Sequence, residues 1–354
     1  MKIMLNLYEY YDLLKKIKNN KSFDLKYDSN EYRNNYDLIL YIVEKYPYST
    51  FYNKNFLINK KLGFALNYAS NNLKNNYNIV LNAVKNNGNA LKYASYDLKN
   101  NYDIVLNAIK NNGYALKYAS INLKNNYNIV LTSVKNCGNT LKNASLNLKN
   151  NYNIVLNAVK CNGEALYYAS KDLKNNYNIV LNAIKEGPWN LEYASNDIKN
   201  NYNFILNIIQ KYEINLKYVS ENLKNNYNIV LTAINVIPGN LKYASNILKD
   251  NYNLVLTAVK IDGNVLKYVS EKLKNNYNIV FNAILNNYYS ILYTNFIINR
   301  KLILNVNKSK YYLKNLDFCD KNIELKLKNI LDYKFKIKRN FILKTKIKNI
   351  FNYF

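Results

Sequence analysis

The sequence predicts an all-α protein, an α-solenoid of tandem two-helix repeats with irregular end-capping units. The first observation behind this prediction is a 25-residue period, marked by one serine in each repeat. The second is that each serine is followed three residues later by Leu or Ile and seven residues later by Tyr. The marking serines are Ser70, Ser95, Ser120, Ser145, Ser170, Ser195, Ser220, Ser245 and Ser270. A repeat of this size cannot bury its own apolar face, so neighbouring repeats must cover one another.

The third observation is helical spacing inside each repeat. In the repeat that begins at Ser70, apolar side chains recur at i, i+3, i+4 and i+7, which predicts a helix with one apolar stripe. The stripe comprises Tyr77, Val80, Leu81 and Val84, widened by Ile79 and Ala83. Asn76 is expected to cap the start of this helix, and Gly88 to end it in a left-handed conformation. Pro188 and Pro238 replace this glycine in two repeats, and proline suits the first turn of a following helix.

A second helix is expected over about Ala90 to Leu98, so that each repeat forms a helical hairpin. Ala90, Leu91 and Ala94 would lie on its buried side, where small residues let helices approach closely. The sequence leaves open whether Ser95 lies inside this helix or caps a separate final turn.

The ends of the array depart from the period. Residues 1–24 predict an N-terminal capping helix, and residues 25–303 the tandem array, whose period is regular from 70 to about 290. Shortened repeats near residues 55 and 295 bracket the regular ones, as expected of end repeats that close an exposed core face. Residues 304–354 lose the period and are interpreted as a basic C-terminal extension.

The composition bounds the function. The net charge is +27 and the pI about 9.6, values typical of proteins that bind nucleic acid or an anionic surface. Nearly all of the positive charge is lysine, and the chain is rich in Asn, Tyr and Ile, a composition that an AT-rich genome imposes whatever the function. The chain has no histidine, and it lacks a phosphate-binding glycine loop, a nucleophile elbow and a carboxylate cluster. We therefore expect no enzyme, no metal and no cofactor.

Cysteine usage and hydropathy indicate the compartment. Cys137, Cys161 and Cys319 are an odd number without metal-type spacing, which favours free thiols in a reducing, intracellular, cytoplasmic setting. No apolar run approaches the roughly 20 residues that cross a bilayer, and charges and tyrosines interrupt the N-terminal segment. Neither a membrane span nor a signal peptide is predicted.

Lysines recur at one position of every regular repeat, four residues after the serine. Stacked repeats would align them into a stripe that follows a nucleic-acid backbone or an acidic partner. The structural interpretation, which we favour, is that each lysine offsets the helix macrodipole in the last turn of a helix. Lys85 and its equivalents in other repeats have the same interpretation. The candidate contacts, with three from the basic extension, are Lys74, Lys99, Lys124, Lys149, Lys174, Lys199, Lys224, Lys249, Lys274, Lys336, Lys338 and Arg339.

Tyrosine and asparagine also recur. The Tyr77 and Tyr93 series would stack on bases in a nucleic-acid binder, but their place on the apolar stripe favours core packing with each hydroxyl at the edge. The asparagines are most simply caps and links between repeats. Positions that vary between repeats favour neutral drift at exposed sites over a recognition code, and leave four candidates for partner recognition: Tyr96, Tyr114, Glu164 and Trp189.

The linked motifs IVLNAVKNNG and ALKYAS resemble a family of tandem short helical repeats of unknown function, found in amoeba-infecting giant DNA viruses and some protists. The resemblance covers residues 25 to about 300 and implies an all-helical array with no established activity. It also suggests a viral origin, with a place in the host cytoplasm or the virion.

Together these observations favour a non-catalytic repeat scaffold that mediates protein–protein interaction. One alternative is sequence-tolerant nucleic-acid binding through the lysine stripe and the basic tail. A second is a structural or virion-associated protein.

Overall fold

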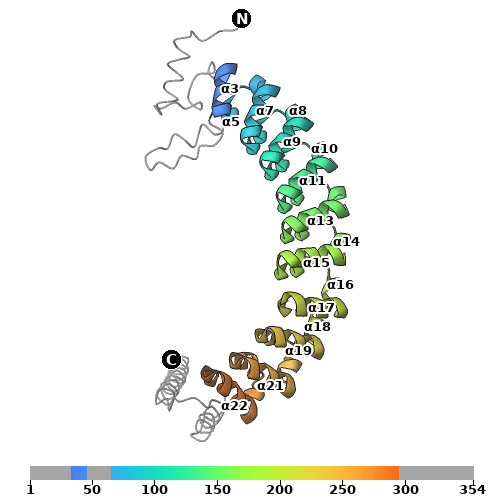
Figure 1. Cartoon of the computed structure of the whole chain (residues 1–354), viewed down its shortest axis with the longest axis vertical. Coiled ribbons are helices and arrows are strands. Elements are labelled where there is room, and N and C mark those ends of the chain that lie inside the picture. Colours follow the sequence, from blue (N-terminus) through green and yellow to red (C-terminus); the bar gives the residue numbers. More distant parts are fainter. Residues whose placement is uncertain (1–32, 46–64, 295–354) are drawn as a thin grey trace, which may run out of the picture. The chain divides into compact units, whose positions relative to one another are not determined.

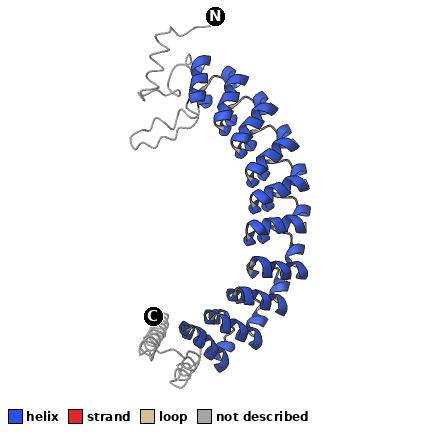
Figure 2. Ribbon diagram, viewed as in Figure 1, coloured by secondary structure: helices blue, strands red, loops and turns tan. Residues whose placement is uncertain are grey.

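A computed structural model describes residues 33–45 and 65–294 of the chain. The chain divides into two compact parts, residues 1–195 and 196–354, each of which is described by itself. Within the described residues every regular element is a helix (Figures 1 and 2), and the same helices recur from repeat to repeat. The prediction of an all-α solenoid is therefore confirmed.

Each repeat contributes one long α-helix. An asparagine caps its start: Asn76 Oδ1 accepts a hydrogen bond from the backbone N–H of Ile79 at 3.2 Å, as expected. The long helices of the first part are α3 (Tyr36–Lys45), α7 (Tyr77–Asn86), α9 (Tyr102–Asn111), α11 (Tyr127–Asn136), α13 (Tyr152–Cys161) and α15 (Tyr177–Glu186). Those of the second part are α17 (Tyr202–Tyr212), α19 (Tyr227–Val236), α21 (Tyr252–Ile261) and α22 (Tyr277–Asn286).

The expected second helix is in fact two. A 3-10 helix comes first, Gly88–Tyr93 in the Ser70 repeat; Ala94 and Ser95 are then extended, and a four-residue α-helix starts after Ser95. Of the two alternatives that the sequence left open, the structure shows the one in which Ser95 caps a separate final turn: its hydroxyl accepts the backbone N–H of Leu98, which begins a new helix and interrupts the helix expected over 90–98. Each repeat thus has three helical pieces rather than a hairpin.

The 3-10 helices and the short helices recur as regularly as the long ones. The 3-10 helices are η1 (Gly88–Tyr93), η2 (Gly113–Tyr118), η3 (Gly138–Asn143), η4 (Gly163–Tyr168), η5 (Pro188–Tyr193), η6 (Leu216–Tyr218), η7 (Pro238–Tyr243), η8 (Gly263–Tyr268) and η10 (Tyr288–Tyr293). The short helices are α5 (Ala65–Tyr68), α6 (Asn71–Lys74), α8 (Tyr96–Lys99), α10 (Ile121–Lys124), α12 (Leu146–Lys149), α14 (Lys171–Lys174), α16 (Asn196–Lys199), α18 (Glu221–Lys224), α20 (Asn246–Lys249) and the 3-10 turn η9 (Leu273–Asn275).

The turn glycine has a different role from the one predicted. No described glycine has a positive φ, and Gly88 begins η1 instead of ending α7. A side chain there would collide with the next repeat, since a Cβ on Gly88 would lie 2.3 Å from the carbonyl oxygen of Ala108. Close approach of two backbones, not left-handed geometry, therefore requires glycine. Pro188 and Pro238 stand at the first position of η5 and η7, as expected.

The buried apolar stripe of the long helix is narrower than predicted, and it is rotated away from the tyrosine. Ile79, Val80 and Val84 are fully buried and Ala83 nearly so, whereas Tyr77 is 41% exposed. The equivalent tyrosines from Tyr36 to Tyr277 are 36–49% exposed, so the prediction that they pack in the core is wrong. Their position explains it: each is the first residue of its helix, at the edge of the buried face.

The core of each part runs between two stacked layers. In the first part, α7, α9, α11, α13 and α15 pack one on the next, and η1 to η5 stack beside them. In the second part, α17, α19, α21 and α22 do the same beside η7, η8 and η10. The short helices lie along the edge of these two layers. In the first part, α8, α10 and α14 form one column (Figure 1).

Several predicted segments lie outside the described residues. These are the capping helix over 1–24, the shortened repeats near 55 and 295, and the basic extension over 304–354.

Candidate functional site

The serine that marks each repeat serves the fold. Ser95 Oγ donates to Asn75 Oδ1 of the preceding repeat at 2.6 Å and accepts the N–H of Leu98 at 3.3 Å. The backbone N–H of Ser95 also donates to the carbonyl of Lys74 at 2.9 Å. The same side-chain link joins Ser120–Asn100, Ser145–Asn125, Ser170–Asn150, Ser195–Asn175, Ser220–Asn200, Ser245–Asn225 and Ser270–Asp250. The recurring asparagines are thus caps and links between repeats, as predicted.

A second polar link joins the ends of the long helices. Asn111 accepts the N–H of Gly88 at 2.7 Å and donates to the carbonyl of Lys85 at 2.9 Å. Cys161 stands at the position equivalent to Asn111, two repeats later. Its thiol accepts the N–H of Gly138 at 3.2 Å. Cys137 and Cys161 are free thiols. These residues stabilise the stacking and leave little chemistry for a ligand.

The Lys74-type lysines stand at the last position of the short helices from α6 to α20, as predicted, and Lys274 lies within η9; all of them are half-buried. Two of them pair with a glutamate three residues earlier: Lys224 with Glu221, the first residue of α18, at 2.6 Å, and Lys274 with Glu271, which precedes η9, at 2.7 Å. The side chains of Lys224 and Lys274 are only 13% and 15% exposed, so their stems pack against the protein. Lys174 lies instead over the ring of Tyr167, 5.3 Å from its centroid.

Burial perturbs several members of this lysine series. Loss of solvation lowers the pKa of Lys99, Lys124, Lys174 and Lys249. Burial, with a smaller contribution from the charge of Arg33, also lowers the pKa of Lys74. The remaining candidate cations of the basic extension, Lys336, Lys338 and Arg339, lie outside the described residues.

An exposed apolar column lies on three successive short helices. Tyr96, Ile121 and Leu146 are the first residues of α8, α10 and α12, and their side chains are 79%, 84% and 82% exposed. We call these three residues the apolar column. Sequence reasoning singled out Tyr96 alone of these three, because it interpreted variation between repeats as neutral drift. The signal was present, since three consecutive repeats carry a large apolar residue where Asn71, Lys171 and the other repeats are polar.

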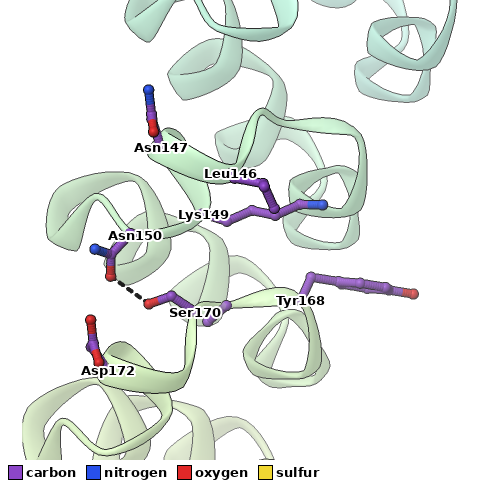
Figure 3. Close-up of a pocket in the computed structure, with 8 residues that line it drawn as sticks. Leu146, Asn147, Lys149, Asn150, Tyr168, Ser170 and Asp172 are labelled. Carbon is purple, nitrogen blue, oxygen red and sulfur yellow. Dashed lines mark hydrogen bonds between the residues drawn. The ribbon is translucent and has the colours of Figure 1, made fainter.

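A groove opens at one end of the apolar column, between α12 and α14 (Figure 3). Its volume is about 580 Å³, and it is lined by Leu146, Asn147, Lys149, Asn150, Tyr168, Ala169, Ser170 and Asp172. The hydrogen bond from Ser170 to Asn150 forms part of its floor at 2.5 Å. Leu146 and Lys149 lie on one face of α12 because they are three residues apart. The groove thus combines an apolar wall, a cation and the Asp172 carboxylate.

The other three candidates for partner recognition lie elsewhere. Tyr114, Glu164 and Trp189 occupy the second position of η2, η4 and η5, so the structure does not bring them together with Tyr96. All three are exposed, Tyr114 at 42% and Trp189 at 50%. A hydrogen bond with Cys137, together with the charge of that thiol, raises the pKa of Tyr114. We call these three residues the 3-10 column.

Lysine and tyrosine also meet along the 3-10 helices. Lys117 lies over the ring of Tyr118 at 4.6 Å, and Lys267 over that of Tyr268 at 4.9 Å. These tyrosines belong to the Tyr93 series, whose described members are half-buried. The rings of Tyr118 and Tyr268 therefore each have a cation over them already.

Metal and membrane features were sought in the described residues alone. Residues 33–45 and 65–294 hold no group of three or more side chains arranged to bind a metal ion. None of the helices in these ranges is both long and apolar enough to span a bilayer.

A comparison with protein families decides the relationship. The model described as Domain of unknown function (DUF4116) matches residues 56–99, 101–149, 151–199, 201–249 and 251–298, more than half of the chain. The chain belongs to the DUF4116 family. This confirms a tandem repeat family of unknown function, although each DUF4116 match spans two of the 25-residue repeats rather than one. The viral or protist origin stays a prediction.

The apolar column crosses from one DUF4116 match to the next. Tyr96 lies in the first match, and Ile121 and Leu146 in the second. No curated protein and no solved structure matches the chain. The site must therefore be interpreted from its own chemistry.

Proposed function

We propose that this DUF4116 chain is a non-catalytic repeat scaffold, intracellular, that binds a protein partner through side chains that differ between repeats. The recurring polar groups, such as Ser95 and Asn75, bond to one another inside the array. The residue that follows each of these serines differs between repeats and projects into solvent, as Tyr96, Ile121 and Leu146 do. Such a division suits a binding surface carried on a rigid repeated frame.

The observation that carries this proposal is the apolar column. Large apolar side chains that are about four-fifths exposed cost solubility, and contiguous exposed apolar surface marks interaction sites. A tyrosine, an isoleucine and a leucine in successive repeats make such a surface, and Trp189 in the 3-10 column offers an aromatic anchor of the kind enriched in protein interfaces.

The test is site-specific photo-crosslinking in the source cells. Benzoylphenylalanine would replace Tyr96, Leu146, Tyr114 or Trp189 in turn, with Asn246 as a polar control at the Tyr96-equivalent position. We expect one or more of the four positions to give discrete protein adducts that unlabelled chain suppresses, and the control to give none. Absence of protein adducts from all four positions would refute the scaffold proposal.

Nucleic-acid binding is the second candidate, favoured by the net charge of +27 and the lysines along the short helices. Binding of the purified chain to random single- and double-stranded RNA and DNA would be measured across a salt series. Phosphate contacts predict a steep loss of affinity with salt that is smaller after Lys99→Gln, Lys124→Gln and Lys149→Gln. Weak binding whose affinity does not change with salt concentration would exclude nucleic-acid binding.

A structural role in a virion is the third candidate. Quantifying the chain in purified particles would decide it.

A further inference from the structure

We propose that the apolar column and the lysines beside it bind an acidic amphipathic segment of the partner protein. This inference rests on the scaffold proposed above and names the partner's chemistry and the surface it uses. The lysines are Lys99, Lys124 and Lys149, the last residues of the same three short helices, and we call them the flanking lysines. Asn71 precedes the apolar column and Lys171 follows it, so the apolar surface is confined to three repeats.

Within residues 33–45 and 65–294, the flanking lysines have no carboxylate partner. The first and fourth residues of a short helix share a face, as the Glu221–Lys224 ion pair of α18 shows. In the three apolar repeats the first position holds Tyr, Ile or Leu, and no ion pair involves a flanking lysine in the part of the chain that the structure describes. A carboxylate from a partner would take the place that Glu221 fills in its own repeat.

Neighbouring side chains add to the positive charge. Tyr167, three residues before Ser170, reaches Lys174 of the following short helix. Lysines occupy that place before the three apolar repeats, at Lys92, Lys117 and Lys142. Each short helix of the apolar column therefore ends in one lysine and follows a 3-10 helix that carries another. Such a surface attracts acidic groups and repels basic ones.

The spacing fits a helical segment. Packed helices lie about 8–10 Å apart, so the three apolar side chains span roughly 20 Å. Seven residues of α-helix advance about 10.5 Å, so apolar residues every seven positions would meet successive repeats, with acidic residues beside them. The Asp172 carboxylate in the groove beyond Leu146 disfavours an acidic residue at that end of the segment.

The chemistry favours protein over nucleic acid. Sequence-tolerant nucleic-acid binding depends on aromatic rings that stack on bases, and only Tyr96 in the apolar column offers one. Ile121 and Leu146 instead match aliphatic side chains of a partner. An acidic amphipathic segment satisfies both the apolar residues and the cations.

The experiment is fluorescence anisotropy with the full chain and a labelled 21-residue peptide, acidic, with leucine at every seventh position. A scrambled peptide of the same composition is the first control. The test variant carries Tyr96→Glu, Ile121→Glu and Leu146→Glu. The matched control variant carries Asn71→Glu, Asn196→Glu and Asn246→Glu, which add the same charge at the same repeat position. Glutamate already stands there at Glu221 and Glu271, so neither variant should disturb the fold, and circular dichroism checks this.

We expect the ordered peptide to bind at least about tenfold more tightly than the scrambled one, and the test variant to lose about tenfold while the control loses less than about twofold. Replacing the flanking lysines by glutamine should weaken binding and reduce its salt dependence. Equal binding of both peptides, or equal losses in both variants, would overturn the inference, because net charge alone would then account for attraction.

Three further outcomes also overturn it. These are no binding of the ordered peptide, competition by single-stranded RNA that the test variant abolishes, and self-association that the test variant abolishes. The first outcome would mean that the surface binds no such segment. The second would mean that it binds nucleic acid, and the third that it binds a second copy of the chain. The scaffold proposal is judged separately, since crosslinks from Trp189 or Tyr114 would support it even if the apolar column bound no peptide.

Discussion

Gly138→Ala should weaken the contact between two successive repeats. A Cβ on Gly138 would lie 2.2 Å from the carbonyl oxygen of Ala158 and 3.0 Å from the backbone nitrogen of Asn162. Relief requires about 1 Å of backbone movement, because attractive contacts of this kind lie beyond 3 Å. The obstacle is backbone, held in place by the 2.9 Å hydrogen bond from Asn162 N–H to that same oxygen. A side chain therefore cannot simply rotate away.

The expected cost follows from two opposing effects. Overpacking a buried site destabilises by about 1–3 kcal/mol. Alanine restricts the unfolded chain more than glycine does, which returns about 0.4–1 kcal/mol where the folded site has room. Gly239 isolates the second effect, since a Cβ there meets nothing within 4 Å. We expect Gly138→Ala to lower the free energy of unfolding by about 1–2 kcal/mol and Gly239→Ala to leave it unchanged or slightly raised.

Urea unfolding followed by circular dichroism measures both variants against the native chain. Hydrogen exchange adds a local readout, because each repeat contacts only its neighbours and the loosened contact should exchange faster in η3 and α13 than elsewhere. Equal unfolding midpoints for the two variants, with unchanged exchange in η3 and α13, would refute the explanation of the glycine by close backbone approach.

Four further substitutions test the frame and its surface. Ser170→Ala removes a cap and the link to Asn150, and should lower the free energy of unfolding by about 1–2 kcal/mol; a loss below about 0.3 kcal/mol in urea unfolding would contradict the linking role. Ile129→Ala in the fully buried stripe should cost about 2–5 kcal/mol and Ile121→Ala under about 0.5 kcal/mol, and similar thermal shifts for both would contradict the assigned burial. Glu213 has φ of 52°, so Glu213→Gly should stabilise by about 1 kcal/mol in urea unfolding, and a destabilised variant would show that the glutamate side chain contributes more than its backbone costs.

Periodicity predicted the architecture because one interface is repeated many times. Asn76 was recognisable as a cap by its spacing, since a capping residue must precede its helix, whereas the sequence left the capping role of Ser95 open. Tyr77 was misplaced because the i, i+3, i+4 pattern locates an apolar face only to within its width, and an amphipathic ring at the edge fits the same pattern. Gly88 was misread because close approach between repeats leaves the same glycine in the sequence as a left-handed turn does.

The surface was harder to predict than the frame. Tyr96, Ile121 and Leu146 are ordinary helix residues, and only the stacking of repeats shows that they form one exposed column. Conversely, Tyr114 and Tyr96 looked alike as variable positions and lie on different helices. The repeat period shows which residues are equivalent. It does not show which of the equivalent positions form one solvent-exposed surface.

The serine link also has an evolutionary consequence. Ser120 meets Asn100, and Ser145 meets Asn125, through the same pair of atoms at 2.6 Å. Excision of residues 120–144 would therefore present Ser145 to Asn100 with an unchanged acceptor. Gene duplication or slippage in steps of one repeat can lengthen or shorten such an array without a new junction having to arise, whereas an indel of any other size would leave one junction mismatched.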